Sequence, residues 1–306
     1  MGGRVEKLNK EGVLSKIFEV AEEIIKERKR PLLLMFYSDR AGKIVPPDVT
    51  ILQTLFEEFY NGEKDEELDL IIYTRGGDVN TSYLLAQLIR SHTQTLFTLV
   101  PYYAYSGGTV ISLSSDLIEM GTNSKISPID VQIGSQDQED MISLLSIEKY
   151  IEFMEHCCTN VFKINDEKCK TEFAVGLTKE LVKNFHPVEL GDIFRLQNLS
   201  KYYARILLID YMFKNVSERR RIAEEIIKRL STESPSHAFD IDIHIAQGIG
   251  LKVESMNQKI YKLSRLLIDY CTKAKQEGLI CHYHARENNL RKPFFFIFGK
   301  KRGEQK

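Results

Sequence analysis

Buried strands alternate with amphipathic helices over roughly the first 130 residues, and this alternation constrains the fold more than any other feature. Strands are expected at 31–37, 68–74 and 95–100, where most residues are apolar. Apolar residues at helical spacing fill the segments between these strands and also cover residues 4–29. This order predicts a mostly parallel sheet whose strands are joined by crossover helices.

The second half of the chain has a different pattern. Short strands expected near 117–120 and 126–133 close the first half, and in the second half helical spacing dominates from 145 to 230 and from 253 to 277. The apolar tail Phe294–Phe298 suits either an edge strand or a contact with another subunit. We therefore expect an α/β fold with a parallel sheet core and a helical C-terminal extension.

Composition and charge exclude several classes of protein. The 306 residues carry a formal net charge of -1, so no global field attracts nucleic acid or an acidic membrane. The run Arg219–Arg221 is flanked by glutamates and is typical of a charged helix face. The apolar run 31–37 is too short to span a bilayer, and residues 1–12 lack the apolar region of a signal peptide. We expect a protein without nucleic-acid partners or membrane spans.

The five cysteines indicate a reducing compartment. Their number is odd and none forms a CxxC pair, which argues against a disulfide framework. A cytoplasmic location is therefore expected. The tract Cys281–His284 holds three possible metal ligands, but no second cluster stands at zinc spacing, so no metal site is predicted.

Ser106 lies in the most informative short motif, Ala104-Tyr-Ser-Gly-Gly-Thr109. A serine between a strand and a helix can occupy a sharp turn, and the following glycines let a substrate approach the backbone. Free N–H groups at a helix N-terminus favour a developing oxyanion. Taken alone, such a Ser-Gly-Gly run is most often a simple turn.

A second glycine turn follows the strand expected at 68–74, in the sequence Thr74-Arg-Gly-Gly-Asp78. Adjacent glycines there can expose backbone N–H groups at the carboxyl edge of the sheet, where α/β proteins bind ligands. The simpler interpretation is a tight turn in which Asp78 caps the next helix. Both interpretations can hold together.

Together the motifs resemble the serine dehydrogenase proteinase family, a Clp-protease/crotonase-like group related to signal-peptide peptidase A. The matching residues are Gly76-Gly77, Ser106–Thr109 and Ser127–Gln132, and the resemblance extends over roughly 30–255. It implies a Clp-protease/crotonase-like fold. The implied domains are an N-terminal helix at 1–30, a serine protease domain at 31–255, and a C-terminal helix and tail at 256–306.

The resemblance also implies a catalytic triad in the chain order Ser, Asp, His. Carried over residue by residue, the triad is Ser106, Asp130 and His237. A serine becomes a competent nucleophile when a base removes its proton and a carboxylate orients that base. The implied activity is hydrolysis of peptide bonds through an acyl-enzyme, on a peptide or protein substrate and without a cofactor.

The family pattern further implies an oxyanion hole built from glycine backbone. The N–H groups of Gly77 and Gly107 would bind the oxyanion, and Gly76 would shape the turn. A closed homo-oligomer is implied as well. The chain departs from the family at Arg75, which replaces a proline, at Gly107, which replaces an alanine, and at Ala238, where aspartate is common.

Several alternatives to the triad remain open. Asp240 or Asp242 can replace Asp130 as the orienting carboxylate, and His244 can replace His237. A Ser-Lys dyad with Lys125 or Lys163 is a further possibility, because signal-peptide peptidases use a lysine base whose pKa is lowered by burial or by a cationic neighbour.

Two other classes of function compete with a peptidase. One is a non-catalytic Clp-like scaffold that binds peptides or supports assembly. The other is a crotonase-type acyl-thioester enzyme, which uses the same oxyanion geometry without a serine nucleophile. Ser106 at the nucleophile position favours the peptidase.

Overall fold

The fold is taken from a computed structural model. It describes residues 10–39, 42–60, 64–129, 132–134, 141–164, 166–184, 187–234, 236, 239–274, 278–283 and 294–298.

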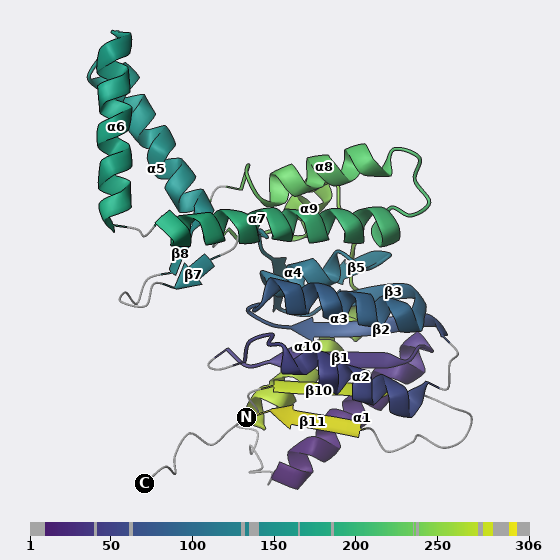
Figure 1. The fold of residues 1–306 in the computed structure, drawn as a ribbon. Helices are drawn as coiled ribbons and strands as arrows, with labels where there is room; N and C mark the ends of the chain where they lie inside the picture. The colour runs from purple at the N-terminus through teal and green to yellow at the C-terminus, as the bar shows by residue number, and fades with distance from the viewer. Residues whose placement is uncertain are drawn as a thin grey trace, which may run out of the picture.

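A seven-stranded mixed sheet forms the centre of the described structure (Figure 1), in the order β11-β10-β1-β2-β3-β5-β9. Five strands run parallel: β1 (Leu32–Tyr37), β2 (Asp65–Tyr73), β3 (Thr93–Val100), β5 (Leu117–Met120) and β9 (Val253–Ser255). Two antiparallel strands extend the sheet beyond β1: β10 (Gly278–Tyr283) and β11 (Phe294–Phe298). The mainly parallel core confirms the predicted α/β fold class.

Helices cover both faces of this sheet because the central strands are apolar on both sides. Every residue of β1 is buried, and successive residues alternate between two hydrophobic clusters. The larger cluster contains residues from α2 (Pro47–Phe59), α3 (Val79–His92), α4 (Gly107–Ser112), α7 (Pro187–Leu207), the π-helix η2 (Leu208–Met212), α8 (Arg219–Leu230) and α9 (Ile243–Ile249). The other face packs against α1 (Lys10–Arg28) and α10 (Gln258–Lys273).

An arm projects from this body (Figure 1). It consists of α5 (Leu144–His156), the π-helix η1 (Cys157–Val161) and α6 (Glu167–Asn184). The antiparallel pair β7 (Gln132–Gly134) and β8 (Met141–Ser143) precedes it. None of the helices within the described ranges combines the length and apolarity needed to cross a membrane.

The C-terminal part differs from the sequence prediction in two strands. Val253–Ser255, predicted as the start of a helix, instead pairs with β5, and the helix begins at Gln258. Gly278–Tyr283 was not predicted as a strand, yet all six residues are buried beside β1. Phe294–Phe298 forms the edge strand that was one of two predictions for this tail.

The possible metal ligands in this region are separated by the pleat of β10. Cys281 belongs to the cluster on the α1 and α10 face, whereas His282 contacts the rings of Phe56 and Tyr60 on the other side. His284 lies outside the described residues. The described part of the tract therefore forms a core strand.

Candidate active site

The two glycine turns lie side by side at the carboxyl edge of the sheet. Thr74, which follows β2, donates its N–H to Tyr103 O at 3.3 Å and accepts from Tyr105 N at 3.0 Å. Tyr103 begins the short strand β4 (Tyr103–Ala104), which pairs with β6 (Lys125–Ile126). The two bonds between Thr74 and the segment Tyr103–Tyr105 place the turn at Gly76 next to the turn at Ser106.

Ser106 occupies a strained backbone conformation directly before α4. Its φ of 50° and ψ of -112° lie outside the regions that residues with a Cβ normally adopt. Such strain costs of order 1–3 kcal/mol and is common at functional sites. A serine on a strained strand-to-helix turn is the geometry of a nucleophile elbow, which exposes the hydroxyl above the sheet.

Ser127 and Thr109 stabilise this strained turn. Ser106 donates its N–H to Ser127 Oγ at 2.7 Å. The N–H of Ser127 donates to Thr109 Oγ1 at 3.1 Å, and the Thr109 hydroxyl lies 2.8 Å from Ala104 O. The sequence analysis gave Ser127 no role, although it begins one of the motifs that carry the family resemblance.

Glycine is required at Gly76 and Gly77, because backbone atoms of neighbouring segments lie within 3 Å of where a Cβ would be, whereas at Gly107 the closest atoms belong to side chains. A Cβ on Gly76, where φ is 104°, would lie 2.6 Å from Ser106 Cβ, and one on Gly77 would lie 2.2 Å from Ile44 O. A Cβ on Gly107 would lie 2.3 Å from Ser82 Oγ and 3.4 Å from Gly77 N. The amides of Gly77 and Gly107 are therefore near each other.

The bonds around Gly77 direct its N–H away from the neighbouring segment. Ile44 donates its N–H to Gly76 O at 3.0 Å and accepts from Asp78 N at 2.9 Å. Within the described ranges, the N–H groups of Gly77 and Gly107 donate no hydrogen bond. Gly107 is the first residue of α4, where helix N–H groups have no intrahelical partner.

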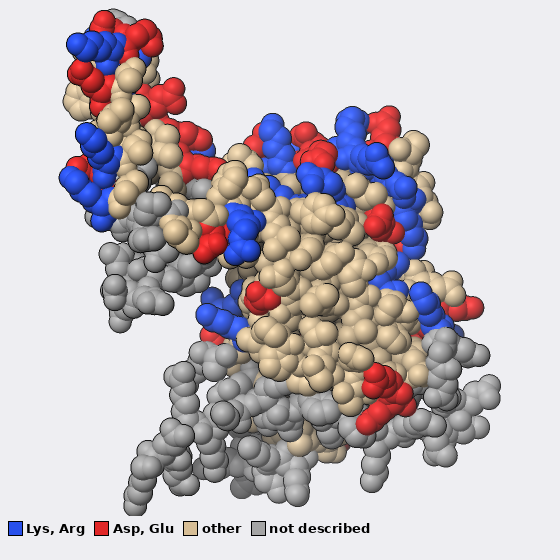
Figure 2. Space-filling view, viewed as in Figure 1, with Lys and Arg blue, Asp and Glu red and all other residues tan. Residues whose placement is uncertain are grey.

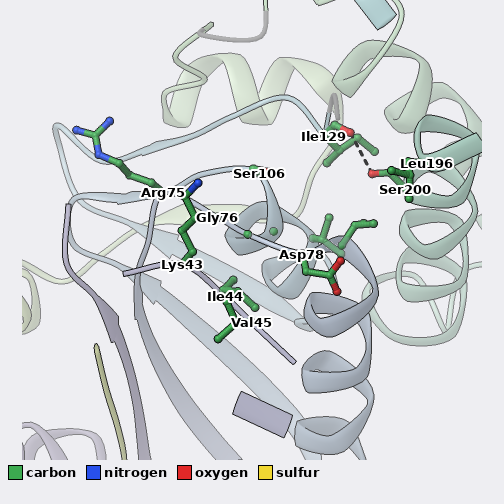
Figure 3. A pocket seen from close by; sticks show the side chains of 14 residues that line it. Lys43, Ile44, Val45, Arg75, Gly76, Asp78, Ser106, Ile129, Leu196 and Ser200 are labelled. Carbon is green, nitrogen blue, oxygen red and sulfur yellow. Dashed lines mark hydrogen bonds between the residues drawn. The ribbon is translucent and has the colours of Figure 1, made fainter. Parts of the chain in front are cut away.

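A pocket of about 470 Å³ opens beside these residues (Figure 3). Its residues come from the loop after β1, the two glycine turns, α3, α4, α7 and the segment after β6. They are Lys43, Ile44, Val45, Arg75, Gly76, Gly77, Asp78, Val79, Ser106, Gly107, Val110, Ile129, Leu196 and Ser200. Ser106, Gly76, Gly77 and Gly107, four of the predicted site residues, therefore lie around one cavity.

Asp130 and His237 lie outside the described residues, but the segments next to them are held close to Ser106. Ile129 lines the pocket and donates its N–H to Leu230 O at 2.9 Å. Ile126 and Ile241 exchange two backbone hydrogen bonds of 3.0 Å.

Asp240 links the segment after His237 to the residue before Ser106. Its carboxylate accepts from the Tyr105 hydroxyl at 2.6 Å and forms an ion pair with Lys125. Burial raises the pKa of Tyr105, and the Asp240 carboxylate raises it further. Burial would raise the pKa of Asp240, but the hydrogen bonds from Lys125 and Tyr105 outweigh it and lower that pKa.

The alternative bases do not line the pocket. Lys125 forms an ion pair with Asp240. Lys163 follows η1, between α5 and α6, and is not among the residues that line the pocket. His244 is exposed at the start of α9. Its backbone N–H and that of Ile245 donate to the Asp242 side chain, which caps the helix.

Comparison with known proteins identifies the central part of the chain. The family model described as ClpP-like SDH-type serine proteinase matches residues 54–186. Protein MJ0137 of Methanocaldococcus jannaschii is 42% identical over 71 residues, which cover 23% of this chain and 25% of that protein. Protein MJ1495 of the same organism is 27% identical over 204 residues, or 66% of this chain and 58% of that protein. The chain therefore spans about a quarter and just over half of these two relatives.

Two solved structures show distant similarity. A variant of the 1510-N membrane-bound stomatin-specific protease aligns with 71% of this chain and 77% of its own, at 16% identity and a TM-score of 0.41. A ClpP1 variant from Listeria monocytogenes aligns with 79% of this chain and 99% of its own, at 12% identity and a TM-score of 0.38. The family match itself covers both glycine turns and Ser106. Residues 54–186 thus match the ClpP-like SDH-type serine proteinase family, the resemblance that the sequence motifs predicted.

Proposed function

We propose that this protein is a serine peptidase that cleaves peptide bonds through an acyl-enzyme on Ser106. The observation that carries the proposal is the strained turn of Ser106 at the start of α4, beside a pocket large enough for a side chain of a peptide. The family match over residues 54–186 supports the same reaction class. Ser106 attacks the scissile carbonyl, and water later releases the acyl group.

The oxyanion that forms in this attack needs hydrogen-bond donors fixed in advance. The N–H groups of Gly77 and Gly107 suit this role, because they flank Ser106 and make no hydrogen bond within the described ranges. Gly76 allows the close approach between the two turns. Removing a single such donor in other enzymes costs roughly 10²–10³ in turnover.

His237 is the proposed general base, and Asp130 is the proposed orienting carboxylate. Two contacts support this assignment: Ile129, next to Asp130, lines the pocket, and Asp240, three residues after His237, bonds to the neighbour of Ser106. The base takes the hydroxyl proton of Ser106 and then donates it to the leaving amine. Asp130 holds the imidazole in the required tautomer.

Hydrolysis of peptides by matched variants tests the function. The wild-type protein should cleave an unstructured protein or a mixed library of quenched fluorescent peptides, and Ser106→Ala should lose turnover by roughly 10⁴–10⁶-fold. Ser217→Ala, which changes an exposed serine before α8, is the matched control and should keep wild-type turnover. Retained turnover in a folded Ser106→Ala protein would contradict the proposal.

A further inference from the structure

Two cationic side chains stand at one side of the pocket. Lys43 comes from the loop after β1, and Arg75 comes from the turn after β2. Figure 3 shows both on one side of Ser106, while Ile129 and Leu196 lie on the other side. The pocket therefore has a cationic side with Lys43 and Arg75, while the other side carries Ile129, Leu196 and the carboxylate of Asp78.

The described residues neutralise these cations only in part. Arg75 Nε lies 3.6 Å from Asp39 Oδ1, the oxygen that also accepts from the hydroxyls of Tyr73, at 3.0 Å, and Tyr103. Asp39 Oδ1 is thus shared among the Arg75 guanidinium and two tyrosine hydroxyls. Lys43 is exposed and forms no ion pair with any residue that the structure describes. Donor capacity on both side chains is left for a ligand.

The acidic residue in the pocket does not offset this charge at the cationic end. Asp78 Oδ1 accepts from Thr81 N at 2.7 Å and from Thr81 Oγ1 at 2.6 Å, so its carboxylate caps α3. A carboxylate at a helix N-terminus is balanced by the helix dipole. The cationic end therefore has positive potential that an anionic ligand group can satisfy.

The opposite side of the pocket has no cation among its described lining residues, and the carboxylate it carries, Asp78, is engaged by Thr81. Ile129 and Leu196 line it, and Ser200 directs its hydroxyl to Ile129 O at 3.0 Å. Burying an apolar side chain against such apolar side chains stabilises a bound peptide. A ligand that complements the whole pocket carries an apolar group at one end and an anion at the other.

We propose that the site prefers peptides with an acidic side chain on one side of the scissile bond and an apolar side chain on the other. This inference rests on the proposed peptidase function and adds the substrate class. Lys43 and Arg75 bind the carboxylate, and Arg75 can do so with two parallel N–H donors. The residue at position 75 then acts in substrate selection.

Matched peptides test the preference. Quenched fluorescent peptides should be identical except for Glu, Gln or Lys, placed in turn at each position around the cleaved bond. Wild-type kcat/KM should be roughly threefold to tenfold higher for Glu than for Gln at one position, because two partly exposed ion pairs contribute this much. The preference should weaken at high salt. The apolar preference should fall on the other side of the cleaved bond.

Variants of Lys43 and Arg75 test whether these two side chains cause the preference for Glu. Lys43→Gln with Arg75→Gln should remove the Glu preference, and Lys43→Glu with Arg75→Glu should replace it with a preference for Lys. Lys262→Gln removes one positive charge from the exposed side of α10 and is the matched control. The control should keep the wild-type preference.

Labelling of Ser106 with a fluorophosphonate, run in parallel, separates the possible failures. If Ser106 is labelled but Glu and Gln peptides are cleaved equally, the charge preference is overturned and the peptidase function stands. A Glu preference that persists in the Lys43 and Arg75 variants also overturns the inference. Absence of both labelling and cleavage overturns the inference together with the proposed function.

Discussion

At the scale of single residues, the strained backbone of Ser106 lowers the stability of the fold. A residue with a Cβ at φ 50° and ψ -112° is strained, whereas glycine adopts these angles without a steric penalty. The bond from Ser106 N to Ser127 Oγ helps to hold the turn in place. The turn therefore lowers the free energy of unfolding while it fixes the position of the Ser106 hydroxyl.

Ser106→Gly should accordingly be more stable than Ser106→Ala. The relief of strain, of order 1–3 kcal/mol, exceeds the extra entropy of glycine in the unfolded chain, which is about 0.4–1 kcal/mol. The expected net difference in the free energy of unfolding is about 1 kcal/mol, measured by urea titration. Equal stability of the two variants would mean that the turn is not strained.

The proposed base gives a second prediction at this scale. A neutral histidine must accept the Ser106 proton, so activity should be low when the imidazole is protonated and should rise through an apparent pKa of roughly 6–7. His237→Ala should lose activity as completely as Ser106→Ala, and His244→Ala should lose little. If His244→Ala loses activity and His237→Ala keeps it, His244 and not His237 is the general base.

The sequence predicts the glycine turns and Ser106 because short motifs carry them. Gly76, Gly77 and Gly107 follow strands directly, so their position at the sheet edge comes from local order. Lys43 and Ser127 were missed as site residues for a physical reason. Lys43 reaches the pocket through the pairing of Ile44 with Gly77, and Ser127 through a side-chain bond to Ser106. Such contacts join segments far apart in the chain.

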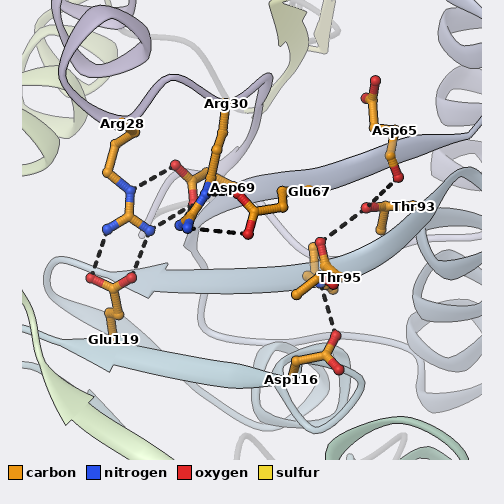
Figure 4. Close-up of polar contacts among 10 residues, drawn as sticks. Arg28, Arg30, Asp65, Glu67, Asp69, Thr93, Thr95, Asp116 and Glu119 are labelled. Carbon is orange, nitrogen blue, oxygen red and sulfur yellow. Dashed lines mark hydrogen bonds and ion pairs between the residues drawn. The ribbon is translucent and has the colours of Figure 1, made fainter.

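At the scale of elements, a buried ion network attaches α1 to the sheet (Figure 4). Arg28, at the end of α1, donates two hydrogen bonds of 2.8 Å to Asp69 of β2 and bonds of 2.6 and 3.0 Å to Glu119 of β5. The Arg28 side chain is 12% exposed, and that of Asp69 is 1% exposed. Removing Arg28 leaves Glu119 without this cation and leaves Asp69 with only the ion pair of 3.6 Å to Arg30.

Arg28→Ala should therefore lower the free energy of unfolding by about 3–5 kcal/mol, as measured by urea titration. Arg221→Ala is the control, because Arg221 pairs with Glu218 on the surface, where an ion pair contributes about 0–1 kcal/mol. A loss below about 1 kcal/mol in Arg28→Ala would show that α1 is not held by this network.

The sequence did not predict the strands β9 and β10, and both lie in the C-terminal part of the chain. Val253–Ser255 is three residues long and is a strand because it pairs with β5. Gly278–Tyr283 is buried along its length between β1 and β11. A short apolar run buried on both faces has no alternation, so periodicity alone does not separate strand from helix.

At the scale of the whole molecule, apolar side chains are exposed on the projecting arm. Phe153 is 60% exposed, Val161 60% and Phe162 63%. Figure 2 shows charges of both signs on the same arm and a broad area with few charges on the main body. Exposed apolar groups of this size favour contact with another protein surface. The homo-oligomer implied by the family resemblance would cover them.

Light scattering should therefore give a mass of at least twice the 35.4 kDa of one chain at micromolar concentration. Phe153→Asp with Phe162→Asp should lower that mass, because charge is costly in an apolar contact. Leu266→Asp, at an exposed position of α10 on the body, should leave the mass unchanged. A wild-type mass near 35.4 kDa would contradict self-association.

Covalent trapping tests the central claim most directly. The protein is incubated with a fluorophosphonate, digested, and mapped by mass spectrometry. The account predicts one adduct, on the peptide that contains Ser106, with no adduct there in Ser106→Ala and an unchanged adduct in Ser217→Ala. A folded, assembled protein that stays unlabelled at Ser106, or is labelled at another serine instead, would contradict Ser106 as the nucleophile.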